Sequence, residues 1–202
     1  MRSFEVARKI VNGEPVSYET DRCQTDAFEP AFEDTQLPLY KTRHSAGADF
    51  FCAQEVVIPS IWKSLFGMLK DGILHVSDRE KARKELEPTL VHTGIKASME
   101  EDECLILCNR SSNPKKLGLV LANGIGLIDK DYYNNVDNDG EIMFAFYNFL
   151  PFDRTIHVGD TLGQGVFQKF FYHQSCHPQS AQCKEYIHRP DALVIIGNSC
   201  KL

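Results

Sequence analysis

The stretch GLVLANGIGLIDKDYYNN, residues 118–135, places a tight turn between two apolar runs and ends in polar residues. Asn123-Gly124 at its centre is the strongest short-range signal for a hairpin, because both residues tolerate positive φ. We therefore predict a β-hairpin that leads into Asp129, with Tyr132 three residues later. Such a hairpin can hold a flat ligand against exposed backbone and place an acid beside it. Taken alone, these residues favour an ordinary surface hairpin with a polar end.

Short apolar runs separated by turn residues recur along the whole chain, whereas helical periodicity is scarce. The runs are ADFFCA, EVVIP, TLVHTGIKA, CLILC, LGLVLAN, EIMFAFYNF, TIHVG and GVFQKFFY, and the stretch quoted above contributes strands at 119–121 and 125–128. This spacing predicts an all-β sandwich or barrel. With 202 residues, of which 43% are hydrophobic and 25% charged, the chain is long enough to form a single domain over residues 1–202.

The charge and the hydropathy exclude several classes of function. A formal net charge of -6 argues against direct nucleic-acid binding through the overall field, and an anionic substrate would need a local basic pocket. The chain has no apolar run long enough to span a membrane, and its start lacks the apolar core of a signal peptide, so we expect a cytoplasmic protein. Seven scattered cysteines match no disulfide framework, and we expect reduced thiols.

Two segments depart from the β pattern. Residues 60–90 predict a helical insertion between two strands, because Ile61, Leu65, Met68 and Leu69 would share one helical face and residues 77–80 have the spacing of a capping box. Packing of this face against the chain's own β-body and binding of a protein partner are about equally good interpretations. Residues 173–202 form a tail rich in Cys and His, whose spacing fits no standard zinc ligand pair.

Four motifs change the interpretation of the hairpin when they are taken together. In order they are SAGADFFCA (45–53), RSSNPKKLGL (110–119), GIGLIDKDY (124–132) and GDTLGQGVF (159–167). In sequence, order and β context they resemble the motifs of the deoxyuridine triphosphatase family, and the resemblance covers about residues 37–172. The resemblance implies a jelly-roll-like subunit, a homotrimer with sites between subunits, and a relationship to dCTP deaminase.

The resemblance also implies a reaction, the Mg²⁺-dependent hydrolysis of dUTP to dUMP and pyrophosphate. Asp129 matches the base that activates the attacking water, and Asp49 matches the aspartate that reaches the water shell of the magnesium ion, which the phosphates bind directly. Structural alternatives stay open for both residues. Asp129 could cap the end of the hairpin, and Asp49 could close a turn after Gly47.

The remaining matches assign the substrate contacts. Arg110, Ser111, Ser112 and Gln164 match residues that bind the phosphates, and the first three supply the local basic and hydroxyl chemistry that the acidic chain otherwise lacks. The turn from Asn123 to Gly126 matches the main-chain groups that pair with the uracil edge, where cytosine would leave groups unpaired. Tyr132 matches the ring that packs under deoxyribose and leaves no room for a 2′-hydroxyl.

The sequence departs from the family pattern in three places. Ser112-Asn113-Pro114 stands where the family has small or apolar residues, residues 133–139 lengthen the loop beside the site, and the glycine-rich C-terminal arm with its phenylalanine is missing. Closure of the site would therefore be absent, supplied differently or supplied by the altered tail. The helical insertion and this tail make a nucleotide-binding regulatory protein with weak or no catalysis the main alternative. A dCTP deaminase is disfavoured, because Ala145 occupies the place of its proton-shuttling glutamate.

Overall fold

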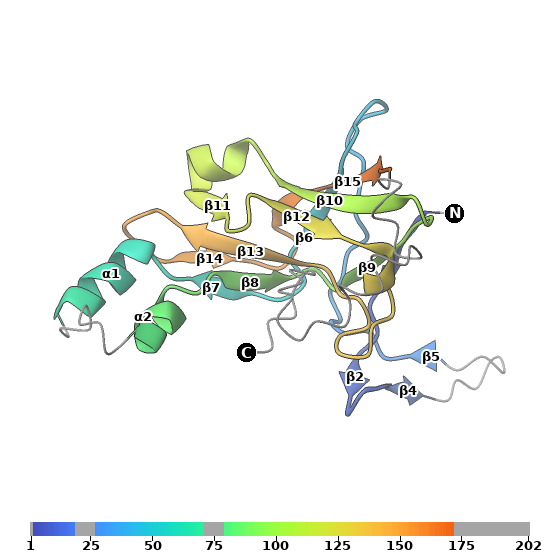
Figure 1. The fold of residues 1–202 in the computed structure, drawn as a ribbon, viewed down its shortest axis with the longest axis horizontal. Coiled ribbons are helices and arrows are strands. Elements are labelled where there is room, and N and C mark those ends of the chain that lie inside the picture. The colour runs from blue at the N-terminus through green and yellow to red at the C-terminus, as the bar shows by residue number, and fades with distance from the viewer. Residues whose placement is uncertain (1, 19–26, 71–78, 172–202) are drawn as a thin grey trace, which may run out of the picture.

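The computed structural model describes residues 2–18, 27–70 and 79–171, and their regular secondary structure is mostly β-strand (Figure 1). The strands are β1 (Ser3–Val6), β2 (Ile10–Val11), β3 (Glu14–Pro15), β4 (Ser17–Tyr18), β5 (Ala27–Phe28), β6 (Ala48–Phe51), β7 (Val56–Ile58), β8 (Thr89–His92), β9 (Ile95–Ser98), β10 (Glu103–Asn109), β11 (Leu119–Leu121), β12 (Ile125–Ile128), β13 (Met143–Asn148), β14 (Arg154–Ile156) and β15 (Thr161–Lys169). The helices are α1 (Ile61–Lys70), α2 (Arg79–Glu85), a π-helical turn η2 (Asn113–Leu117) and a 3-10 turn η3 (Lys130–Tyr132).

Two antiparallel sheets form the body. One has the strand order β12-β10-β15-β6 and the other the order β11-β13-β8, while β7 pairs with β14 and β1 with β9. The rings of Phe50 on β6 and Phe144 on β13 lie 5.8 Å apart between centroids, so the two sheets share one core. The all-β, jelly-roll-like fold that the sequence predicts is confirmed.

The glycines of the fourth motif have a packing role in this core. A Cβ at Gly163 would lie 2.1 Å from the ring of Phe144, and one at Gly165 would lie 2.5 Å from the ring of Phe50. Because side chains alternate along a strand, Gln164 between them points to the other face of the sheet. The two glycines of the motif therefore leave space for two core phenylalanine rings on one face of the sheet, and the glutamine between them lies on the other face.

The structure corrects the predicted hairpin. Strands β11 and β12 have the predicted bounds, but they do not pair with each other: β11 pairs with β13 and β12 with β10. The turn between them is closed by hydrogen bonds from the N–H of Gly124 to the carbonyl of Leu121 and from Ala122 to Ala145, so the chain crosses from one sheet to the other. The hairpin prediction was wrong because an Asn-Gly turn determines a chain reversal and not the partner of each strand.

Helices α1 and α2 lie between β7 and β8, at one end of the body (Figure 1). Met68 is buried and Ile61 and Leu65 are half-buried, as a shared inward face requires, but Leu69 is 57% exposed. The predicted capping box at 77–80 is only partly within the described residues, and α2 begins at Arg79.

Leu69 belongs to a second apolar stripe on α1. Trp62, Phe66 and Leu69 are spaced four and three residues apart, which places them on one helical face, and all three are exposed. The indole Nε1 of Trp62 donates to the carbonyl of Phe149 at 3.0 Å and thereby ties the helix to the loop after β13. Helix α1 is thus apolar on two sides, one packed inward and one facing outward.

Over the described ranges, no helix has the length and apolar character needed to cross a membrane. Cys52, Cys104 and Cys108 are free thiols, and the other four cysteines lie outside the residues that the structure describes. The Cys- and His-rich tail also lies outside them.

Candidate active site

Three of the four motifs meet at the carboxylate of Asp49. This residue lies on β6 opposite Gln164 of β15, and its side chain is 1% exposed. Gln164 Nε2 donates to Asp49 Oδ1 at 2.8 Å, Lys41 Nζ lies 2.5 Å from Oδ2, and Arg110 Nη2 lies 3.8 Å from Oδ2. We call Lys41, Asp49, Arg110 and Gln164 the Asp49 cluster.

The Asp49 cluster has an excess of positive charge. Burial alone would raise the pKa of Asp49, but the hydrogen bonds from Lys41 and Gln164 and the charge of Arg110 outweigh it and lower the pKa below its usual value. The cluster therefore contains one carboxylate and two cations. The side chains of Lys41 and Arg110 are 48% and 30% exposed, so both can reach an anionic ligand from solvent. This is the local basic site that an anionic substrate requires in an acidic chain.

The loop of the second motif is held to the core by Asn113. This side chain is buried, its Nδ2 donates to the carbonyl of Leu162 at 2.6 Å, and its N–H donates to the carbonyl of Arg110 at 3.0 Å. Ser111 is exposed and Ser112 is half-buried on the turn that Asn113 closes. The departure from the family pattern at this position is thus an anchor that orients Arg110 and the two serines.

Asp129 occupies a different part of the same sheet. It follows β12, lies at the N-cap position of η3 and is exposed, yet its side chain makes no capping hydrogen bond. The structure therefore does not support the alternative in which Asp129 is a cap. Burial raises the pKa of the Cys104 thiol on β10, and the nearby negative charge of Asp129 raises it further.

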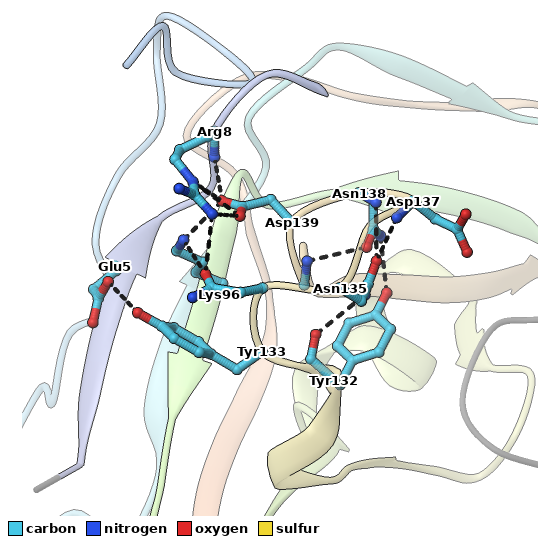
Figure 2. A network of polar contacts seen from close by, with 11 residues as sticks. Glu5, Arg8, Lys96, Tyr132, Tyr133, Asn135, Asp137, Asn138 and Asp139 are labelled. Carbon is cyan, nitrogen blue, oxygen red and sulfur yellow. Dashed lines mark hydrogen bonds and ion pairs between the residues drawn. The ribbon is translucent and has the colours of Figure 1, made fainter. Parts of the chain in front are cut away.

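Tyr132 is half-buried and packs against the core at the end of η3. Its hydroxyl donates to the carbonyl of Glu141 at 3.0 Å. The same hydroxyl accepts a hydrogen bond from Asn138 Nδ2 at 2.9 Å (Figure 2). Burial raises the pKa of Tyr132, so the hydroxyl stays neutral and keeps its donor. The ring is thus held at its polar end.

The turn and β12 carry the residues predicted to contact the base. Asn123 is exposed at the turn, and Gly126 is buried where a Cβ would lie 3.0 Å from the Cβ of Leu107. Gly126 therefore allows β12 to approach β10 closely. In the four-stranded sheet β12 is an edge strand, and its outer main-chain groups are not paired with any strand that the structure describes.

Within one chain the Asp49 cluster and Asp129 are far apart. Asp49, Gln164, Cys108 and Ile125 lie side by side across β6, β15, β10 and β12, and Asp129 follows Ile125 by four residues. Four residues along a strand and three strand spacings across a sheet place the two carboxylates about 19 Å apart. A water held by Asp129 cannot attack a phosphate held by Arg110 of the same chain over this distance.

Known proteins share this sequence and fold. A deoxyuridine 5′-triphosphate nucleotidohydrolase from Lactococcus lactis is 38% identical over 134 residues, which make up 66% of this chain and 73% of the relative. The crystal structure of a dUTPase from Streptococcus mutans matches with a TM-score of 0.56 and 33% identity, over 71% of this chain and 95% of that one. The chain belongs to the deoxyuridine triphosphatase family. No protein-family model matches it.

More distant relatives agree with this assignment. A deoxyuridine 5′-triphosphate nucleotidohydrolase from Wolinella succinogenes is 25% identical over 144 residues, 71% of this chain and 76% of the relative. A dUTPase from phage phi11 of S. aureus has 18% identity and a TM-score of 0.51 over 70% of this chain and 88% of that one, which shows a shared fold.

The fit of a magnesium ion to this dUTPase-family chain depends on Asp49. Magnesium prefers oxygen ligands and is commonly held by one or two carboxylates together with substrate phosphates. Asp49 has the right chemistry, and its Oδ2, which also pairs with Lys41 Nζ, keeps acceptor capacity for a water of the ion's shell. The described residues contain no group of three or more His, Cys, Asp or Glu that could hold a metal ion.

Sequence reasoning did not identify Lys41 or Asn113 as parts of the site. Lys41 stands in the segment LPLYKTRHSAGAD before the first motif, and only the fold shows that its ammonium faces Asp49. Asn113 was noted only as a departure from the family pattern, and nothing in the sequence indicated that its side chain is buried.

Proposed function

We propose that this protein hydrolyses dUTP to dUMP and pyrophosphate in the presence of Mg²⁺. The observation that carries the proposal is the convergence of Asp49, Arg110 and Gln164, from three separate motifs, into one half-exposed basic site. The known activity of the related dUTPases gives this site its substrate. Arg110, Ser111 and Ser112 would bind the phosphates, and Gln164 would lie beside them.

The outer edge of β12 and its turn would select the base. Uracil presents an acceptor, a donor and a second acceptor along one edge, which main-chain groups near Asn123 and Gly126 can match. The ring of Tyr132 would pack under the sugar and exclude a 2′-hydroxyl.

Asp129 would serve as the general base. Its exposed carboxylate, which no capping bond occupies, accepts a proton from water as the water oxygen attacks the α-phosphorus. The bond from the α-phosphorus to the bridging oxygen of the β-phosphate breaks, and pyrophosphate leaves. Magnesium, bound by the phosphates and reached by Asp49 through water, would neutralise the charge on the phosphate oxygens.

The separation of Asp129 from Asp49 supports a site shared between subunits. If the Asp129 loop of one subunit faces the Asp49 cluster of the next, the two halves meet without any change of fold. A homotrimer, which the family resemblance predicts, provides three such sites.

A second role as a protein-binding module is favoured by one observation. The outward stripe Trp62, Phe66 and Leu69 on α1 exposes large apolar side chains and contains no residue of the four motifs. This insertion would serve a protein partner or the assembly and leave the catalytic step unchanged. Both roles can coexist on one fold.

The deciding experiment is an assay of the purified protein with dUTP, dCTP, dTTP and UTP, with pyrophosphate and ammonia measured separately. We expect pyrophosphate from dUTP far in excess of the other nucleotides, and no ammonia. Asp129→Asn should abolish turnover and preserve dUTP binding, because it removes the base and keeps the shape. Wild-type turnover in that variant would contradict the assignment of Asp129, and ammonia release from dCTP would indicate a deaminase.

A further inference from the structure

The loop that follows Tyr132 is fixed by a buried carboxylate. Asp139 is 1% exposed and lies at a φ of 59°, a left-handed conformation that is uncommon outside glycine. It accepts hydrogen bonds from the N–H of Arg8 at 2.8 Å, from Arg8 Nε at 2.9 Å and from Lys96 Nζ at 2.8 Å (Figure 2). Arg8 Nη2 forms an ion pair with the same carboxylate. The N-terminal segment and β9 thus hold one point of the loop from two directions.

Two asparagines connect Asp139 to Tyr132. Asn138, the neighbour of Asp139, donates from Nδ2 to the Tyr132 hydroxyl at 2.9 Å, and Asn135 donates from Nδ2 to the Tyr132 carbonyl at 3.1 Å. Asn135 Oδ1 accepts from the N–H of Asn138 at 3.0 Å, and the N–H of Asp139 donates to the carbonyl of Asn135 at 3.0 Å. We call Arg8, Lys96 and the Asp139 carboxylate that they hold the Asp139 clamp. A short chain of hydrogen bonds connects this clamp to both ends of Tyr132.

Tyr133 is held on the opposite side by the same clamp. Its hydroxyl donates to Glu5 Oε2 at 2.7 Å, and the ammonium of Lys96 lies 4.9 Å from the centre of its ring. Burial and the Glu5 carboxylate raise the pKa of Tyr133 to about 12, so it remains a donor. The side chains of Tyr132 and Tyr133 are directed to different partners (Figure 2).

The chemistry of the clamp indicates a role in geometry more than in stability. Burying two charged groups has a desolvation free energy that cancels much of the free energy gained from their attraction. Apolar residues of the same size therefore often stabilise a protein equally well. A buried pair with several directed hydrogen bonds instead selects one conformation of the segment that carries it. Here that segment is the loop next to Tyr132.

We propose that Asp139, clamped by Arg8 and Lys96, is a positioning residue that holds the ring of Tyr132 and thereby sets the discrimination between deoxyribonucleotides and ribonucleotides. The inference rests on the proposed function, in which Tyr132 packs under the sugar. It assigns a role in sugar selection to the N-terminal segment around Arg8, which carries none of the four motifs. A ring held at both ends cannot retreat from a 2′-hydroxyl, whereas a loosened ring can.

The test compares Arg8→Gln and Asp139→Asn with a matched control, Arg2→Gln. Arg2 lies on the same N-terminal segment and also pairs with a buried carboxylate, that of Glu103 on β10, whose hydrogen bonds go to Arg2 and to the N–H of Glu100 and not to the loop at 133–139. Asparagine is chosen at 139 because it tolerates positive φ and keeps the shape of the side chain. For each variant kcat and KM are measured with dUTP and with UTP, and folding is checked by thermal unfolding.

We expect both clamp variants to lower the ratio of kcat/KM for dUTP to that for UTP by about tenfold, with kcat for dUTP changed by less than about threefold. Arg2→Gln should reduce the stability and leave the ratio within about twofold of the wild type. A merely structural role would move the stability of all three variants and the ratio of none. If the ratio in Arg8→Gln and in Asp139→Asn equals that in Arg2→Gln, the inference is overturned.

Tyr132→Ala separates this inference from the function on which it rests. A lower ratio in Tyr132→Ala together with unchanged ratios in the clamp variants would overturn the positioning role alone. An unchanged ratio in Tyr132→Ala would show that the sugar is recognised elsewhere and would overturn both.

Discussion

A site shared between subunits predicts that two inactive variants restore activity when they assemble together. Asp129→Asn disables the Asp129 loop and leaves the Asp49 cluster intact, whereas Arg110→Gln does the reverse. Each variant alone should retain less than about a hundredth of the wild-type kcat/KM, because it loses either the base or a phosphate ligand in every site. In a mixed oligomer, the intact loop of one subunit can face the intact cluster of the next.

The activity expected of the mixed oligomer follows from the distance between the Asp129 loop and the Asp49 cluster within one chain. At about 19 Å they cannot act on one phosphate within a chain, so every site takes one half from each of two subunits. With equal amounts of the two variants, half of the subunits supply an intact loop and half supply an intact cluster. About one quarter of the sites in randomly mixed rings then combine two intact halves. Sequential purification on two tags removes the rings that contain only one variant, so in the remaining mixed trimers one site in three is intact, and the mixture should show about one third of the wild-type kcat per site.

The assay uses co-expression with two different affinity tags and sequential purification, followed by pyrophosphate release from dUTP. The matched control combines two differently tagged copies of the Asp129→Asn chain, so no site of that mixture holds an intact loop. Activity in the control as high as in the test pair, or no restoration in a mixed oligomer of confirmed composition, would refute the shared site.

Three further predictions concern the surroundings of the site. Replacing residues 61–88 with a short Gly/Ser linker should leave a folded dUTP hydrolase, because no motif lies there; a loss of hydrolysis with an unchanged solution mass would place the insertion in the active site. Asn113→Ala should lower the free energy of unfolding by about 1 to 3 kcal/mol, since the buried carbonyl of Leu162 loses a donor; an unchanged denaturant midpoint would contradict this. Arg2 lowers the pKa of Glu103 from 4.5 to about 2, so their pair stabilises the fold fully above pH 4.5 and loses this effect as the pH falls toward about 2. The destabilisation by Arg2→Gln should therefore be larger at pH 7 than at pH 3, and equal values would contradict the pair's role.

The strands could be predicted from the sequence because each carries its own pattern. Residues 143–148 alternate buried and half-buried side chains along β13, as the run EIMFAFYNF indicates. The bounds of β11 and β12 are also those predicted. The alternation of apolar and polar residues is a local property, so it does not depend on which strand is the pairing partner.

The polar anchors of the site could not be predicted in the same way. Asp49, Arg110 and Gln164 were found through motifs, which record residue types at fixed spacing. Lys41 and Asn113 act through burial and direction, and both depend on segments that are distant in the chain. An asparagine before proline has the same local preference on a surface turn as in a buried anchor.

The crossing of the chain from one sheet to the other shows most clearly what could not be predicted from the sequence. It also bears on function. Leu121 and Ile128 are both buried, and each contributes to the core from a different sheet. In a paired hairpin the two strands would satisfy each other's main-chain groups along one edge. Because β11 instead pairs with β13, the outer edge of β12 keeps main-chain donors and acceptors that no described strand uses. The predicted recognition of uracil needs such unpaired groups, so the feature that contradicts the hairpin supports the proposed base contact.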